Sequence, residues 1–304
     1  MLQMDVINAV EKMQEYIDNH MQEKITLKQL ANVAGYSPWH CGRIFKKLTG
    51  RTLFEYIRGI RLTKAALLLR DEEHKIIDVA LDFVFDSHEG FTRAFSKEFG
   101  LSPKSYSQLK PPIQLFIPTK IRDYYLAMDK GGIELQKSRE NKTIFVQVIE
   151  RPKRKLLLKR GIKATEYFSY CEEVGCDVWS LLTSVKEALY EPIGMWLPKH
   201  LIMEGTSEYV QGVELPLDYA KGIPVGYELI DLPSCKMMVF QGEPYDDENF
   251  MAEISDVWEA ITKYNPQIYG FDWDPEVAPS FQLIPMGYRG YIEARPVKGV
   301  NTSI

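Results

Sequence analysis

The chain has 304 residues, of which 45% are hydrophobic and 26% charged, a globular composition with enough length for two domains with cores. No apolar run approaches the roughly 18 residues that cross a membrane, and residues 1–14 are acidic and amphipathic rather than signal-like, so we expect a cytoplasmic protein without a membrane partner. The net charge of −5 argues against nucleic-acid affinity spread over the whole chain.

The charge is unevenly distributed along the sequence. Residues 36–64 contain seven basic residues and one acidic residue, a net charge of +6. Residues 111–304 contain 21 basic and 28 acidic residues, a net charge of −7. A local basic region joined to an acidic remainder indicates a DNA-contacting domain linked to a domain with another task.

The four cysteines do not follow a metal-binding pattern, since none form a CxxC pair and Cys171 and Cys176 lack a nearby histidine. The sequence also shows no phosphate-binding loop and no Ser-His-Asp arrangement. We therefore expect free thiols, no metal, no cofactor and no catalytic residues.

The first hundred residues are predicted to form helices. Apolar residues recur at helical spacing over 5–19, and Thr26 is a cap for a second helix over 27–34. Gly35 then makes a turn, and Ser37 caps a third helix, which ends at Gly50. A helix, a short glycine-bearing turn and another helix is the helix-turn-helix arrangement.

This arrangement recurs about fifty residues later. A long helix from Thr52 joins the first copy to a second one, in which residues 75–83 precede a helix capped by Ser87 and ended by Gly100. Six residue types are repeated at the same spacing: Ser37 and Ser87, Arg43 and Arg93, Phe45 and Phe95, Lys47 and Lys97, Gly50 and Gly100, Tyr56 and Tyr106. The repeat predicts two DNA-reading helices that enter successive major grooves roughly 34 Å apart.

Residues 5–109 resemble the AraC/XylS family of bacterial transcription regulators. The resemblance rests on Phe85, Ser87, Phe91, Arg93, Phe95, Phe99-Gly100, Ser102-Pro103 and Tyr106, with a departure at Val84, where the family usually has glycine. It implies that the base-facing positions are Trp39, Gly42 and Arg43 in the first reading helix and His88, Glu89, Thr92 and Arg93 in the second.

Side-chain chemistry assigns roles to these positions. Arg43 and Arg93 are suited to bidentate contacts with guanine, and Glu89 to accepting a hydrogen bond from cytosine. Other basic residues are expected to contact phosphates, which sets affinity rather than sequence preference. These are Lys46, Lys47, Arg51, Arg61, Lys97 and Lys104.

We place the DNA-binding domain at residues 1–109 and a linker at 110–142. Within the linker, residues 113–118 have a strand-like pattern and are expected to form a short strand or an interdomain contact.

Residues 143–300 form the second predicted domain, which also contains a duplication. An offset of 81 aligns Ile149 with Ile230 and Pro152 with Pro233, and a helical segment and two strand-like runs follow each copy. The predicted unit is β-α-β-β, present twice, with one antiparallel sheet and both helices on one face. The expected fold is therefore an all-α tandem helix-turn-helix domain joined to an α+β domain.

The internal duplication and the terminal YIEARPVK run resemble the GyrI-like effector-binding domain. The resemblance implies a pocket in which a glutamate of the last strand, here Glu293, meets cationic or amphipathic ligands. Strand alternation independently places Tyr291, Glu293 and Arg295 on one face, so Glu293 either serves a ligand or pairs with Arg295. An offset of 79 makes Glu214 its repeat partner. The candidate ligand-binding residues are Glu293, Tyr291, Trp258, Trp273 and Tyr209.

These observations predict a transcription regulator that binds double-stranded DNA and a small-molecule effector and has RNA polymerase as a possible partner. Two alternatives remain open for the second domain. It is a hydrolase of small electrophilic compounds, with Glu293 as general base beside Tyr291 or Tyr209, or it is a ligand-independent platform for protein contacts.

Overall fold

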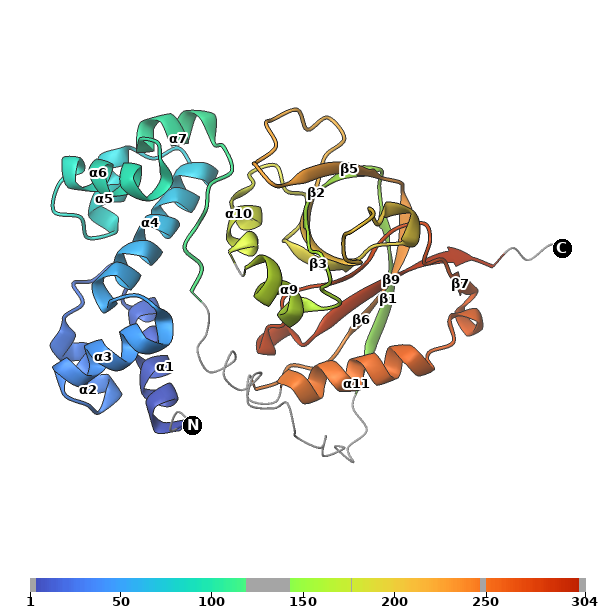
Figure 1. Ribbon diagram of the computed structural model, residues 1–304, viewed down its shortest axis with the longest axis horizontal. Coiled ribbons are helices and arrows are strands. Elements are labelled where there is room, and N and C mark those ends of the chain that lie inside the picture. The colour runs from blue at the N-terminus through green and yellow to red at the C-terminus, as the bar shows by residue number, and fades with distance from the viewer. Residues whose placement is uncertain (1–3, 119–142, 176, 247–249, 301–304) are drawn as a thin grey trace. The chain divides into compact units, whose positions relative to one another are not determined.

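The computed structural model describes residues 4–118, 143–175, 177–246 and 250–300 (Figure 1). The chain divides into two compact units, Met1–Ile133 and Glu134–Ile304. The first is helical, and the second contains one antiparallel sheet with helices. None of the described helices is both long and apolar enough to cross a membrane.

The helical unit contains seven helices in its described part. They are α1 (Met4–Asn19), α2 (Leu27–Ala34), α3 (Pro38–Thr49), α4 (Leu53–Asp71), α5 (Ile76–Asp82), α6 (His88–Phe99) and α7 (Pro103–Leu109). The hydroxyl groups of Thr26, Ser37 and Ser87 accept main-chain hydrogen bonds at the starts of α2, α3 and α6. Gly50 and Gly100 end α3 and α6 in the left-handed conformation. The predicted helix boundaries and caps are therefore confirmed.

Helix α4 is shared between two separate cores, because it buries two of its faces. Its first half supplies Leu53, Tyr56, Ile57 and Ile60 to a core formed with α1, α2 and α3. Its second half supplies Leu62, Ala65, Ala66 and Leu69 to a core formed with α5, α6 and α7. Each core holds one helix-turn-helix, so α4 is the strut that the sequence predicted between the two reading helices.

A segment after α7, which we call the return segment (residues 113–116), belongs to the helical unit. It runs back beside α4 (Figure 1), and the main-chain N–H of Phe116 donates a 2.8 Å hydrogen bond to the Thr63 hydroxyl. Ile113 and Leu115 are buried in the second core. The expectation of a short strand is wrong here, because these apolar side chains pack into the helical cores instead. Residues 119–142 of the predicted linker lie outside the described residues.

The sheet unit contains nine strands in its described part (Figure 1). They are β1 (Phe145–Arg151), β2 (Arg154–Arg160), β3 (Ile193–Trp196), β4 (Tyr209–Leu215), β5 (Glu228–Leu232), β6 (Cys235–Gln241), β7 (Phe271–Trp273), β8 (Ser280–Gln282) and β9 (Ile292–Gly299). The helices are α9 (Tyr167–Val174), α10 (Val178–Ser184) and α11 (Phe250–Lys263), with short 3₁₀ turns at Lys199–Leu201, Pro266–Tyr269 and Gly287–Arg289.

The strand order β1-β6-β9-β8-β3-β4-β2-β5 reads as two equivalent halves that meet between β8 and β3. Every strand pair is antiparallel, and each half lends its first strand to the other, since β1 pairs with β6 and β5 pairs with β2. The predicted β-α-β-β unit lacks one strand, because Pro152 and Pro233 each interrupt a segment that forms two strands. The first half is therefore β-β-α-α-β-β and the second is β-β-α-β-β, with a small extra strand, β7, paired to β9.

The two faces of the sheet have different partners. Helices α9 and α10 pack on one face beside Leu157 and Val213, and α11 packs on the same face beside Met238 and Phe240. Leu156 and its neighbours on the other face form a core that contains strand and loop residues. The helices thus share one face, as expected.

Register identifies the true counterpart of Glu293 in the first half. Glu293 pairs with Phe240 on β6, and Gln211 pairs with Lys159 on β2. Because Lys159 and Phe240 are equivalent at the offset of 81, Gln211 is the counterpart, and the assignment of Glu214 is wrong. The two positions lie three residues apart, and an odd difference places them on opposite faces of a strand.

Glu214 instead belongs to a buried ion cluster on the face without helices. It pairs directly with Leu156 across the sheet, and its carboxylate lies 2.5 Å from Arg154 Nε and 3.2 Å from Arg151 Nη1. All three charged side chains are almost fully buried. A buried carboxylate requires such partners, because desolvation of an unpaired charge is costly.

The turn after α5 carries local strain. Val84 has φ of 60°, and its N–H donates to Leu81 O while that of Phe85 donates to Ala80 O. This is the hydrogen-bond pattern of a helix end that favours glycine. Gly35 holds the equivalent place after α2, with φ of 71°. A β-branched residue in the left-handed region is strained, and Val84 lies outside the second core.

We predict that Val84→Gly stabilises the helical unit by about 1 kcal/mol, because glycine adopts this conformation without a steric penalty. Urea denaturation followed by the helical circular dichroism signal measures the change. Gly35→Ala is the matched control and should destabilise the unit by a similar amount. An unchanged or lower stability of Val84→Gly would show that the turn is not strained.

Candidate functional sites

The first reading helix, α3, presents an exposed aromatic ring next to an exposed arginine. Trp39 has an exposed fraction of 72%, and the Arg43 guanidinium lies 4.8 Å from the centre of its ring. Stacking of this kind restricts the arginine before it meets DNA. Lys46 and Lys47 are exposed in the last turn. A side chain at Gly42 would meet no atom within 4 Å, so packing does not require glycine there.

The second reading helix, α6, exposes most of its predicted contact residues. His88, Glu89, Arg93 and Lys97 are exposed. Thr92 is half-buried, and its hydroxyl oxygen is buried without a hydrogen-bond partner among the described residues. Its hydroxyl is therefore turned away from solvent.

Two arginines predicted to contact phosphates are engaged within the unit. Arg61 donates from Nε to Met21 O at 3.0 Å and from Nη2 to Glu23 O at 2.5 Å. These bonds tie its guanidinium to the main chain that follows α1. Arg51 lies 4.2 Å above the ring of Phe116 and 3.8 Å from Glu98. Its guanidinium is held at the junction of the two helix-turn-helix motifs.

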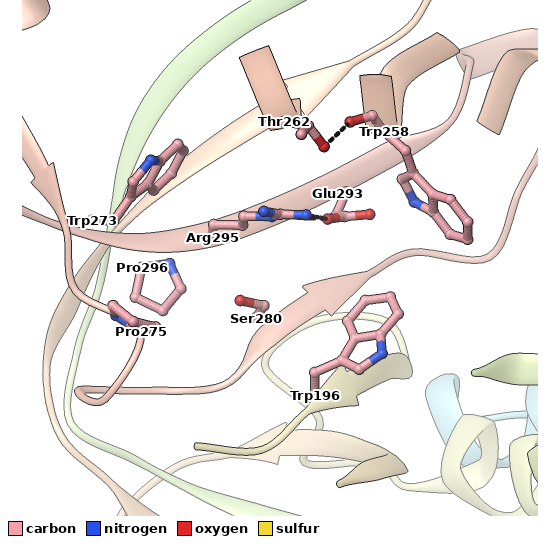
Figure 2. A pocket seen from close by; sticks show the side chains of 9 residues that line it. All are labelled: Trp196, Trp258, Thr262, Trp273, Pro275, Ser280, Glu293, Arg295 and Pro296. Atoms are coloured by element: carbon pink, nitrogen blue, oxygen red, sulfur yellow. Dashed lines mark hydrogen bonds and ion pairs between the residues drawn. The ribbon is translucent and has the colours of Figure 1, made fainter. Parts of the chain in front are cut away.

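The sheet unit contains a pocket of about 590 Å³, within the size range of small-molecule sites. Figure 2 shows Glu293 and Arg295 side by side in it, with the indole rings of three tryptophans around them. Its lining residues are Trp196, Trp258, Thr262, Trp273, Pro275, Ser280, Glu293, Arg295 and Pro296.

Glu293 is held by partners on both carboxylate oxygens. Oε1 accepts a hydrogen bond from Arg295 Nε at 3.1 Å and lies 3.1 Å from Nη2 in an ion pair. Oε2 lies 3.0 Å from the Tyr291 hydroxyl, whose one proton is shared between Glu293 and Gln282. The Glu293 side chain is 3% exposed, whereas that of Arg295 is 39% exposed. The pair therefore places a buried negative charge beneath a positive charge that reaches solvent.

A chain of hydrogen bonds continues behind the pocket. Trp258 Nε1 donates to the Tyr291 hydroxyl at 3.2 Å, and that hydroxyl lies 2.9 Å from Gln282 Oε1. Gln282 Nε2 donates to the Tyr209 hydroxyl at 3.0 Å. Burial, followed by the nearby Glu293 charge, raises the pKa of Tyr291, and burial raises the pKa of Tyr209. Both phenols therefore stay protonated and act in hydrogen bonding.

Tyr209 depends on a glycine across the sheet. A Cβ at Gly194 would lie 2.1 Å from the Tyr209 hydroxyl oxygen, so only glycine leaves room for this ring. Tyr209 and Tyr291 are equivalent positions in the two halves, each two residues before Gln211 or Glu293. The hydrogen-bonded chain therefore joins one half of the duplication to the other.

The structure brings together three of the five predicted ligand-binding residues. Glu293, Trp258 and Trp273 line the pocket. Tyr291 and Tyr209 are fully buried and support it from behind. The sequence interpretation did not select Trp196 as a wall. Trp196 on β3 pairs with Ser280 on β8, and both line the pocket, so only the strand pairing between halves reveals this wall.

Within the described residues, no group of three or more His, Cys, Asp and Glu side chains is arranged to hold a metal ion.

Known proteins that are similar to this chain match its helical unit. The helix-turn-helix domain family matches residues 30–108. The chain is 40% identical to Regulatory protein SoxS of Salmonella typhimurium over 92 residues, which are 30% of this chain and 86% of that protein. It is 43% identical to the Transposon Tn10 TetD protein of Escherichia coli over 95 residues, which are 31% of this chain and 69% of that protein.

The match to a longer relative is partial. Over 120 residues the chain is 37% identical to the Right origin-binding protein of Escherichia coli K12, covering 37% of this chain and 42% of that protein. A solved structure, the DNA-binding domain of AdpA in complex with a target DNA, is similar with 24% identity and a TM-score of 0.32, covering 33% of this chain and 90% of that one.

The tandem helix-turn-helix motifs, their shared strut and these relatives lead to one assignment. The chain belongs to the AraC/XylS family of DNA-binding transcription regulators.

Proposed function

We propose that this regulator responds to a small amphipathic cation, which binds in the pocket of the sheet unit and changes how the helical unit binds DNA. The observation that carries the proposal is a buried carboxylate, Glu293, in a pocket walled by three tryptophans. Aromatic faces and a carboxylate together favour a lipophilic cation, because the ring quadrupole and the negative charge act in the same direction. The symmetric two-half sheet supports the resemblance to GyrI-like effector-binding domains.

DNA reading is assigned to the exposed residues of α3 and α6. Arg43, pre-positioned by Trp39, and Arg93 contact guanine edges in successive major grooves. Lys46, Lys47 and Lys97 are exposed on the same helices and contact phosphates.

The cation reaches Glu293 by exchange with Arg295. The guanidinium occupies one carboxylate oxygen through a hydrogen bond from Nε and an ion-pair contact from Nη2, so a ligand cation must take its place. Arg295 is partly exposed, and a displaced guanidinium regains water, which keeps the cost of exchange small. Arg295 thus acts as an internal competitor that sets the threshold for the ligand.

The hydrolase alternative has less support. A general base needs a lone pair directed at a substrate or a water molecule. The Glu293 side chain is 3% exposed, its Oε1 accepts a hydrogen bond from Arg295, and its Oε2 lies 3.0 Å from the Tyr291 hydroxyl, so little of the carboxylate is open to a substrate or a water molecule. We therefore assign the pocket to sensing rather than to turnover.

We predict that Arg43→Ala and Arg93→Ala each weaken binding to the preferred DNA site by about 1–3 kcal/mol and relax the base preference at one position. The site is selected from random duplexes, and binding is measured by fluorescence anisotropy. Lys47→Ala is the control, and it should weaken binding to all sequences and lower the salt slope by about 1. Unchanged affinity and selectivity in both arginine variants would contradict the assignment.

We predict that Arg295→Met tightens the binding of tetraphenylphosphonium by about tenfold, or about 1.4 kcal/mol, because the competing guanidinium is gone. Glu293→Gln should weaken it, because the charge that attracts the cation is lost. Tryptophan fluorescence follows binding, and Lys298→Met, an exposed position of the same strand, is the control. Equal or weaker binding by Arg295→Met would exclude competition, and no effect of Glu293→Gln would remove Glu293 as the sensing residue.

A further inference from the structure

We infer that Phe116 is a positioning residue for DNA recognition: through the return segment it fixes the two helix-turn-helix motifs relative to each other. The motifs occupy two separate cores, and each is anchored to a different half of α4. The return segment contacts both cores, although it follows both motifs in the sequence. It contains none of the residues assigned to DNA contact.

The contacts of the return segment divide between the two cores. Ile113 and Leu115 are buried in the second core, and Phe116, one residue later, packs against the first. The segment therefore spans the boundary between the motifs along the side of α4. Movement of one core about α4 would break contacts at one end of this short segment.

Phe116 itself is closely fitted to α4. Its ring lies against Gly59, where a Cβ would come within 2.6 Å of Phe116 Cδ1, and makes an edge contact with Tyr56 at 5.3 Å between ring centres. Its main-chain N–H is bound to Thr63 at 2.8 Å. Glycine in the middle of a helix lowers helical stability. Here the absence of a side chain at Gly59 leaves the space that the Phe116 ring occupies.

The outer face of the Phe116 ring supports a link between the motifs. Arg51, which follows α3, stacks on this ring at 4.2 Å and reaches Glu98 in the last turn of α6 at 3.8 Å. Both charged side chains are partly exposed, and such a pair alone stabilises little. Stacking on Phe116 restricts the guanidinium to the side of α6, so the aromatic ring gives the ion pair its direction.

This geometry has a consequence for DNA binding. Once one reading helix is bound, the second binds as an intramolecular event, and its effective concentration at its own groove depends on how rigidly the two are connected. We call the base pairs that one reading helix contacts a box. A loosened connection lowers the affinity for a DNA site that contains both boxes, and it widens the range of spacings between the boxes that the protein tolerates. It leaves the affinity for a single box unchanged.

The test uses the full chain with Phe116→Ala and a DNA site selected from random duplexes. Duplexes carry both boxes, one box with the other scrambled, or both boxes with one base pair inserted between them. Ile117→Ala, an exposed neighbour, is the matched control. Phe116→Leu tests partial rescue, and Glu98→Gln removes the ion pair alone. Thermal unfolding of each variant shows that the helical unit is folded under the binding conditions.

We expect Phe116→Ala to weaken binding to the two-box site by about tenfold, to change single-box binding by less than about twofold, and to reduce the penalty of the inserted base pair. Phe116→Leu should recover part of the difference, and Glu98→Gln should show a smaller effect of the same kind. Equal loss of affinity for two-box and single-box DNA, or no loss for either, would overturn the inference. If Phe116→Ala is unfolded at the binding temperature, Phe116→Leu and Glu98→Gln take its place. The same comparison of two-box and single-box affinities then decides the inference.

Discussion

Apolar burial across a duplication boundary is the constraint on which both units depend. In the helical unit, each helix-turn-helix closes its core against one half of α4. In the sheet unit, each half gives its first strand to the other half and the two join at β3 and β8. Sharing of this kind makes each pair of halves a single cooperative structure.

The pocket results from the same constraint. Trp196 belongs to the first half of the sheet unit and Glu293 to the second, and strand pairing between halves places both at one cavity. The hydrogen-bonded chain from Tyr291 through Gln282 to Tyr209 crosses the same boundary. Equivalent positions of the duplication have diverged in chemistry, since the second half carries Glu293 where the first carries Gln211. The asymmetry gives one charged site in place of two.

The sequence was sufficient for features that are local. Caps such as Ser37 and Ser87, the ending glycines and the two-core role of α4 follow from spacing and composition. Features that depend on long-range register were not accessible. Sequence offsets of 79 and 82 both align similar residues, so the sequence alone does not distinguish Glu214 from Gln211 as the counterpart of Glu293. The two positions lie on opposite faces of the strand, and only the strand register shows which of them is equivalent to Glu293. Trp196 was missed for the same reason.

Two other features depend on partners that are distant in the sequence. Arg61 has the charge expected of a residue that contacts phosphate, but its Nε and Nη2 groups donate hydrogen bonds to the main-chain carbonyls of Met21 and Glu23, about forty residues earlier. The return segment has the alternation of a strand, but its apolar side chains fill the sides of α4. In both cases the local pattern was read correctly, and a distant element determined how it was used.

The proposed function couples ligand binding in the sheet unit to DNA binding by the helical unit. Linkage requires the coupling to be reciprocal, so DNA must change ligand affinity by the factor by which ligand changes DNA affinity. The most direct measurement is the tetraphenylphosphonium affinity of the full chain, determined by calorimetry with and without a saturating two-box duplex. We expect the two affinities to differ severalfold, and the same factor should be recovered when DNA affinity is measured with and without the cation. Identical ligand affinities in the presence and absence of DNA would contradict it.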